Sequence, residues 1–116
     1  MSSVPKGWES EPVVYVVQED PSKNMTSALN FGSCEALLQQ KEEATMFNIP
    51  TITAKLRRGL RDFTVRDFLL LSGSPVSIGI ACAIAAEKTG GQYNVLKWDG
   101  QERRYWKARI NLHQGE

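Results

Sequence analysis

The stretch that decides the fold is DFLLLSGSPVSIGIACAIAAEKTGGQYNVLKW, residues 67–98. Its pattern predicts a strand, a tight turn, a helix and a second strand, in that order, over residues 68–71, 72–75, 75–88 and 93–98. Two apolar strands joined by a helix favour a right-handed parallel crossover. The helix has no polar stripe before Glu87, and a helix that is apolar on all sides is expected to be buried by other elements.

The turn before this helix has two interpretations. Ser74 is a good N-cap, and Pro75 suits the first helical position, so a capped turn explains the pattern. A strand–turn–helix also directs free N–H groups outward, which suits a phosphate at Ser72, Gly73 and Ser74. However, the chain has neither GxxxxGK[ST] nor GxGxxG, and no lysine is placed to reach a phosphate. We expect a capped turn, with an anion-binding turn in a nucleotide-binding domain as an alternative.

The rest of the chain predicts further strands and one more helix. PVVYVVQ, residues 12–18, is apolar on both faces and predicts a buried strand, and residues 19–33 predict a loop with a turn of helix at 26–29. The whole is expected to be one α+β domain: a mixed sheet of about five or six strands with the helix packed across it. We expect a flexible tail at residues 1–11, the domain at residues 12–112 and a frayed C-terminus at residues 113–116.

Residues 34–47, CEALLQQKEEATMF, are ambiguous. Their composition favours a helix. Yet their apolar residues form two clusters, Ala36–Leu38 and Ala44–Phe47, around a charged centre, which is also typical of a hairpin with a solvated turn. On periodicity alone, the helix is slightly favoured.

A second helix is predicted from Ile52, Leu56, Leu60 and Phe63, which recur at helical spacing. Either Thr51 or Thr53 is the candidate cap after Pro50, and Gly59 either ends or weakens this helix. Its basic residues are expected to form a solvated face, with a binding surface as the alternative: Lys55, Arg57, Arg58 and Arg61.

The chain is expected to end in a hairpin of residues 93–98 and 104–112 around Asp99–Gly100. A loop of three or five residues places Leu96 and Trp98 on one face with Trp106, Ala108, Ile110 and Leu112. That register predicts that Trp98 and Trp106 are buried. The opposite face would then carry Tyr93, Lys97, Tyr105, Lys107 and Arg109.

This hairpin is rich in basic and aromatic residues, a mixture that suits a single-stranded nucleic acid because rings stack on bases and cations meet phosphates. The candidate residues are Lys97, Arg103, Arg104, Tyr105, Lys107 and Arg109, together with Arg57 and Arg58 of the second helix. The plainer interpretation is a solvated strand whose charges discourage edge pairing.

Composition restricts the function only broadly. The 116 residues suffice for one domain, 41% are hydrophobic and 23% charged, and the net charge of +1 does not indicate nucleic acid. We find no metal-ligand spacing, no cofactor motif and no catalytic arrangement, because His113 lies near the end and neither Cys34 nor Cys82 has a histidine partner. Neither a signal peptide nor a membrane-spanning run is recognisable, which predicts a soluble cytosolic protein without a membrane partner.

Four blocks of the sequence resemble a family of small tailed-phage proteins found in marine and podovirus-like genomes. They are VVYVVQE, LRRGLRDF, DFLLLSGSPVSIGIACAIAA and LKWDGQERRY, at residues 13–19, 56–63, 67–86 and 96–105. The family often has Asp at the position of Ser74, which is also a helix cap. It also tends to have strand-like residues and a Pro/Gly turn at residues 34–47, which favours the hairpin there.

The resemblance implies a phage protein that acts in the cytoplasm of an infected bacterium, and it implies no particular activity. We therefore expect a small non-enzymatic accessory protein that binds a macromolecule, with a host or phage protein favoured. The alternatives are a nucleic-acid-binding module that uses the hairpin and a nucleotide-binding domain that uses residues 72–75. A homodimer that covers the apolar helix is a further possibility.

Overall fold

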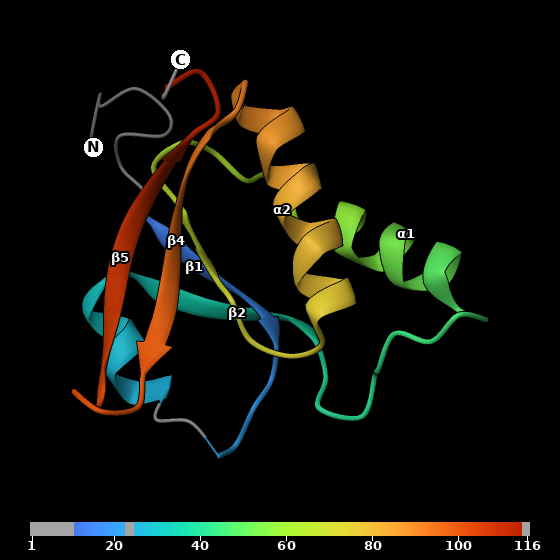
Figure 1. The fold of residues 1–116 in the computed structure, drawn as a ribbon, viewed down its shortest axis with the longest axis horizontal. Coiled ribbons are helices and arrows are strands. Elements are labelled where there is room, and N and C mark those ends of the chain that lie inside the picture. The colour runs from blue at the N-terminus through green and yellow to red at the C-terminus, as the bar shows by residue number, and fades with distance from the viewer. Residues whose placement is uncertain (1–10, 23–24, 115–116) are drawn as a thin grey trace, which may run out of the picture.

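The computed structural model describes residues 11–22 and 25–114 and contains one five-stranded mixed sheet (Figure 1). The strand order is β2-β1-β3-β4-β5; the first four strands are parallel, and β5 is antiparallel to β4. The bounds are β1 Val13–Gln18, β2 Ser33–Leu38, β3 Phe68–Leu70, β4 Gln92–Asp99 and β5 Arg104–Asn111. The α+β prediction is confirmed; the predicted tail, except Glu11, lies outside the described residues, as do residues 115–116.

Helices cover the two faces of the sheet unequally. The α-helices α1 (Ile49–Gly59) and α2 (Pro75–Thr89) lie together on one face, whereas the short 3-10 helix η1 (Met25–Asn30) lies on the other (Figure 1). The turn of helix expected at 26–29 is therefore confirmed. None of the helices in the described part of the chain is long and apolar enough to cross a membrane.

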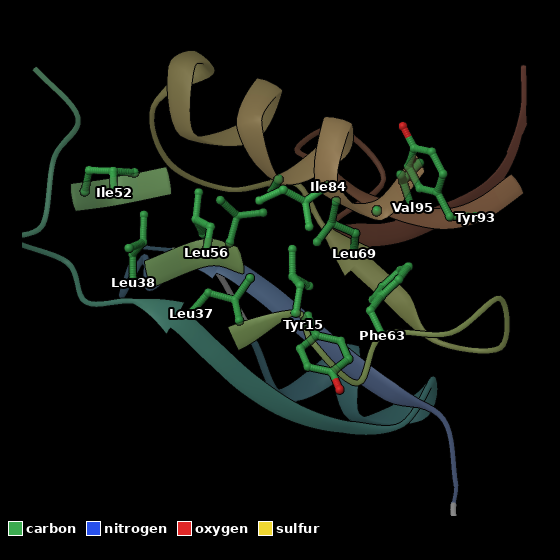
Figure 2. Close-up of a cluster of buried hydrophobic side chains, with 14 residues drawn as sticks. Tyr15, Leu37, Leu38, Ile52, Leu56, Phe63, Leu69, Ile84, Tyr93 and Val95 are labelled. Atoms are coloured by element: carbon green, nitrogen blue, oxygen red, sulfur yellow. The ribbon is translucent and has the colours of Figure 1, made fainter. Parts of the chain in front are cut away.

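The main core lies between the sheet and the two α-helices. Tyr15 and Leu69 project from β1 and β3 toward Leu56 of α1 and Ile84 of α2 (Figure 2). The alternate residues of these strands, such as Val16, are buried on the other face below η1. Both faces of the central strands are therefore apolar, which explains why β1 has no polar alternation.

The strands, turn and helix over residues 67–98 form in the predicted order, but the helix is buried on one side only and not on several sides as expected. β3 and β4 pair in parallel with α2 between them. The Ser74 side chain accepts a hydrogen bond from the Val76 N–H, and Gly90, with φ of +67°, donates its N–H to the Ala86 carbonyl at the other end. Ile84 is buried against the sheet, while Val76, on the outward side of α2, is 49% exposed.

Residues 34–47 form neither a helix nor a hairpin, so both predictions for this segment are wrong. Ser33–Leu38 is a single strand that pairs in parallel with β1, and residues 39–48 form a loop that leads to α1. Leu37 and Leu38 are both buried in the main core. The backbone pairing with β1 and this burial outweigh the helix propensity of the segment.

The second helix confirms the predicted periodicity but begins earlier than the threonine caps implied. Ile52 and Leu56 are its buried residues, and Leu60 and Phe63, which follow its last residue Gly59, are buried as well. Asn48 occupies the N-cap position without a side-chain cap hydrogen bond, so Thr51 and Thr53 are not caps but lie inside the helix. Pro50 stands in the first turn, where its missing N–H does not cost a helical hydrogen bond.

The predicted register of the hairpin is wrong. Asp99 pairs with Arg104, so the loop is residues 100–103 and its length is even. Trp98 consequently pairs with Tyr105, whereas Trp106 pairs with Lys97 on the other face and is 41% exposed. The prediction assumed one apolar face, but both faces of β4 bury apolar side chains, so this criterion does not determine the register.

Candidate functional site

The turn of residues 72–75, for which anion binding was the alternative to a capped turn, lies where the strand order reverses, between β1 and β3. In open sheets with parallel strands, the crevice at the carboxyl ends of two such strands is the usual place for a ligand. Here the side chain of Gln18, at the end of β1, occupies it. Gln18 Oε1 accepts a hydrogen bond of 3.4 Å from the Ser74 N–H, and the Val76 N–H is bonded to Ser74 Oγ.

The other residues of this turn also bond within the protein. Ser72 is buried, and its hydroxyl donates to the Gln18 carbonyl at 2.6 Å. Gly73, with φ of +103°, is in close contact with the Gln18 side chain. The turn thus uses its polar groups to join β1 to β3 and α2, and the Gln18 amide lies where a phosphate would have to bind.

The nitrogen of the Gln18 amide, Nε2, holds the loop between β2 and α1. Gln18 Nε2 lies 3.1, 3.1 and 3.0 Å from the carbonyl oxygens of Gln39, Gln40 and Glu42. The Glu42 carboxylate accepts a hydrogen bond from the Gln39 N–H at 2.6 Å and also pairs with Lys55 of α1. Those two interactions, the backbone bond first, lower the pKa of Glu42. The first half of the loop is therefore held to both β1 and α1.

The second half of the loop is organised by Asn48. Its Oδ1 accepts from the Thr45 N–H at 2.6 Å, and its Nδ2 donates to the Glu43 carbonyl at 2.9 Å. The Phe47 N–H donates to the Thr45 hydroxyl at 3.2 Å. These are local side-chain to backbone bonds of the kind that define a specific turn. The segment just before α1 therefore has a defined conformation.

This braced turn presents two large apolar side chains to solvent. Met46 is 82% exposed and Phe47 is 88% exposed. We call these two residues the apolar tip. They adjoin α1 at the end of the molecule furthest from the β4–β5 hairpin (Figure 1). These are the two most exposed of the large hydrophobic side chains in the described part of the chain, and they are adjacent, so the tip is a candidate contact surface.

The basic residues predicted on the hairpin have varied roles. Lys107 lies over the Phe68 ring, with 5.9 Å from Nζ to the ring centroid. Arg109 donates at 3.0 Å to the Val65 carbonyl and to Asn94 Oδ1, and Arg104 lies 3.9 Å from the Glu102 carboxylate. Lys107 and Arg109 therefore have intramolecular contacts that account for their positions.

Three other candidates complete this group. Lys97 is exposed on the α2 side of the sheet, and Arg103 is exposed in the hairpin loop at φ of +55°. Tyr105 is buried, its hydroxyl lies 3.2 Å from the Met25 sulfur, and burial raises its pKa. Its ring packs edge-on against Trp98, so it is a core residue rather than an exposed stacking platform.

The two basic groups predicted as one nucleic-acid surface lie far apart. Arg57 and Arg58 belong to α1, which Figure 1 shows beyond α2 and on the opposite side of the molecule from the hairpin. Arg57 pairs with Glu87 of α2 at 2.9 Å, while Arg58 is exposed. The structure therefore does not bring the two groups onto a shared surface.

The residues with catalytic potential are also engaged in the fold. Asp67 is buried and accepts hydrogen bonds from the Val13 N–H at 2.9 Å and the Thr64 N–H at 2.8 Å. His113 Nε2 lies 2.9 Å from the Gly90 carbonyl oxygen. Burial raises the pKa of both Cys34 and Cys82, which disfavours their thiolates. Within residues 11–22 and 25–114, no group of three or more His, Cys, Asp or Glu side chains is arranged to hold a metal ion.

Sequence reasoning missed the apolar tip because Met46 and Phe47 formed part of an apparent apolar cluster at residues 44–47. Hydrophobicity predicts burial for such a cluster. The available signal was local: Thr45 and Asn48 flank the pair, and both residue types commonly form turns. A turn centred on Met46–Phe47 would direct these side chains outward.

Comparison with known proteins identifies the family. No curated protein and no solved structure matches the chain. The family model described as phage Pam3 gp32-like protein matches residues 12–112, which include every strand and helix described above. This agrees with the resemblance to small tailed-phage proteins in the sequence. The chain therefore belongs to the phage Pam3 gp32-like protein family.

Proposed function

We propose that this phage protein is a non-enzymatic accessory protein that binds another protein, of the host or of the phage, through the apolar tip. It acts in the cytoplasm of the infected bacterium. The observation that carries the proposal is the exposure of Met46 and Phe47, at 82% and 88%, on a turn fixed by hydrogen bonds.

The physical advantage of this arrangement is twofold. Burying each side chain in a partner contributes about 1.5–3 kcal/mol of hydrophobic free energy. Because Asn48 and Gln18 already fix the loop, little conformational entropy remains to be lost on binding. A few rigid apolar side chains of this kind commonly dominate the affinity of an interface.

The alternatives have less support. The Gln18 amide occupies the turn that a nucleotide phosphate would need. Lys107 and Arg109 of the hairpin contact Phe68, Val65 and Asn94 of the same chain. For these reasons we favour a protein partner over nucleic acid or a nucleotide.

Affinity capture from host and infected-cell lysates tests the proposal. We expect the unmodified protein to retain a specific protein and the Met46→Ser/Phe47→Ser variant to lose it by at least about tenfold. Leu112→Ser is the matched control, because Leu112 is 61% exposed but lies just after β5. Equal retention by the two variants would contradict a role for the tip.

A salt-dependent affinity for single-stranded oligonucleotides that is lost with Arg103→Ala/Arg104→Ala would favour the nucleic-acid alternative instead. Stabilisation by nucleotides at millimolar concentration in a thermal-shift assay would favour the nucleotide alternative.

A further inference from the structure

The helix that follows the apolar tip has an asymmetric charge. The sequence of α1, IPTITAKLRRG, contains three cations and no acidic residue. Two of these cations are paired within the protein: Lys55 with Glu42, and Arg57 with Glu87. Arg58 is exposed, and it has no ion pair with any residue in the described part of the chain.

Arg61 extends this basic surface beyond the helix, since it is also exposed and makes no ion pair among residues 11–22 and 25–114. Arg58 is nine residues after Ile49, the first residue of α1, which corresponds to about 14 Å along a helix that rises 1.5 Å per residue. The apolar tip thus precedes the first turn of α1, and two exposed arginines lie in and just after its last turn.

We propose that the partner of the apolar tip is a protein with an apolar groove flanked by carboxylates on the side that faces α1. This inference rests on the proposed function and adds the chemistry of the partner. Met46 and Phe47 fill the groove, and Arg58 and Arg61 meet the carboxylates. Complementary charge at the rim of an interface mainly sets the association rate and the orientation of the partners.

The charges around the tip favour this occupant over phosphate-bearing surfaces. The exposed charges before the tip are mixed: Glu43, three residues before Met46, is acidic, and Lys41 is basic, a pattern that suits a patterned protein surface rather than a uniformly anionic one. A nucleic acid or an anionic lipid surface would bring phosphates close to this carboxylate as well as to Arg58. A protein groove can place carboxylates next to Arg58 and none next to Glu43, so it suits the charges on both sides of the tip.

Site-specific photocrosslinking in infected cells tests the inference, with p-benzoylphenylalanine placed at Phe47 in one variant and at Arg58 in another. Both positions are exposed, so the substitutions should leave the fold intact. We expect both variants to crosslink to the same protein, position 47 within an apolar segment and position 58 next to Asp or Glu residues.

The outcomes separate this inference from the proposed function. A protein crosslink from position 47, with position 58 crosslinked to nucleic acid, to lipid, or to a segment without acidic residues, would overturn the acidic flank alone. Failure of both positions to crosslink to any protein would overturn both proposals.

Charge reversal provides a second test on the partner recovered in this way. Arg58→Glu/Arg61→Glu should weaken binding at least about tenfold at low salt, and the difference should shrink at high salt. Arg103→Glu/Arg104→Glu, on the distant hairpin, is the control and should bind like the unmodified protein. The same loss in both double variants would contradict a localised acidic flank.

Discussion

The side chain of Gln18 lies directly against the backbone of Gly73. A Cβ atom on residue 73 would stand 2.4 Å from Gln18 Oε1 and 2.6 Å from Gln18 Cβ. Gly73 also has φ of +103°, a conformation that other L-residues rarely adopt. One amide side chain therefore fills the crevice between β1 and β3 and also holds the loop that leads to the apolar tip.

Gly73→Ala should lower the free energy of unfolding by about 1–3 kcal/mol, because it combines a strained backbone with a steric contact. Gly79→Ala is the control: it lies inside α2, and nothing lies within 4 Å of the added Cβ atom. It should raise stability by about 0.5–1 kcal/mol through the better helix propensity of alanine. Urea denaturation measures both values, and equal stabilities would contradict the Gln18–Gly73 contact.

The loss of stability should depend on the charge of the side chain that replaces Gln18. Gln18→Met removes the hydrogen bonds to the 39–42 loop and should cost about 1–3 kcal/mol. Gln18→Glu should cost more, because a carboxylate would face three carbonyl oxygens without a donor. Thermal unfolding at neutral pH compares the two variants. If Gln18→Glu were more stable than Gln18→Met, the assigned orientation of the amide would be wrong.

Glu42 should make stability depend on pH in the acid range. Its pKa is lowered in the folded protein by the Gln39 N–H and then by Lys55, so the unfolded state binds the proton more readily. The stabilisation is therefore fully present above the unfolded pKa, near 4.5, and is lost as pH falls through the lower folded pKa. Glu42→Gln should flatten the acid limb of the stability profile, whereas Glu43→Gln, at an exposed neighbour, should leave its shape unchanged.

The apolar tip should contribute little to folding. Because Met46 and Phe47 are almost fully exposed, Met46→Ser/Phe47→Ser should change the free energy of unfolding by no more than about 0.5 kcal/mol. Leu56→Ala, in the buried core, should cost about 2–5 kcal/mol. Chemical denaturation compares the two, and a large loss in the tip variant would mean that these side chains pack within the protein.

Tyr15 should weaken the fold in alkali. Burial, and then the Asp67 charge, raise its pKa from 10.0 to about 12. The unfolded chain therefore loses this proton first, so stability is fully present below pH 10 and falls as pH rises from 10 to 12. Tyr15→Phe should be less sensitive over this range when unfolding is followed by circular dichroism. An unchanged alkaline profile would argue against the burial of the Tyr15 hydroxyl.

Much of the fold could be predicted because its signals are local. Ser74 and Pro75 start α2, Gly90 ends it, and the apolar runs on either side form β3 and β4. Each of these features depends on residues close in the chain, so a reader of the sequence can find them. The core residues of α1, such as Leu56, follow from helical spacing for the same reason.

The candidate site depended on contacts between distant segments. Pairing with β1 made β2 a strand against its helix propensity, and burial on both faces of β4 permitted the even hairpin loop. Gln18, more than twenty residues away from the 39–42 loop in sequence, fixes that loop and leaves Met46 and Phe47 exposed. The sequence by itself therefore determined the strand–helix–strand unit, whose signals lie within a few residues. Only the tertiary structure decided which apolar side chains face solvent, because burial depends on what the rest of the chain covers.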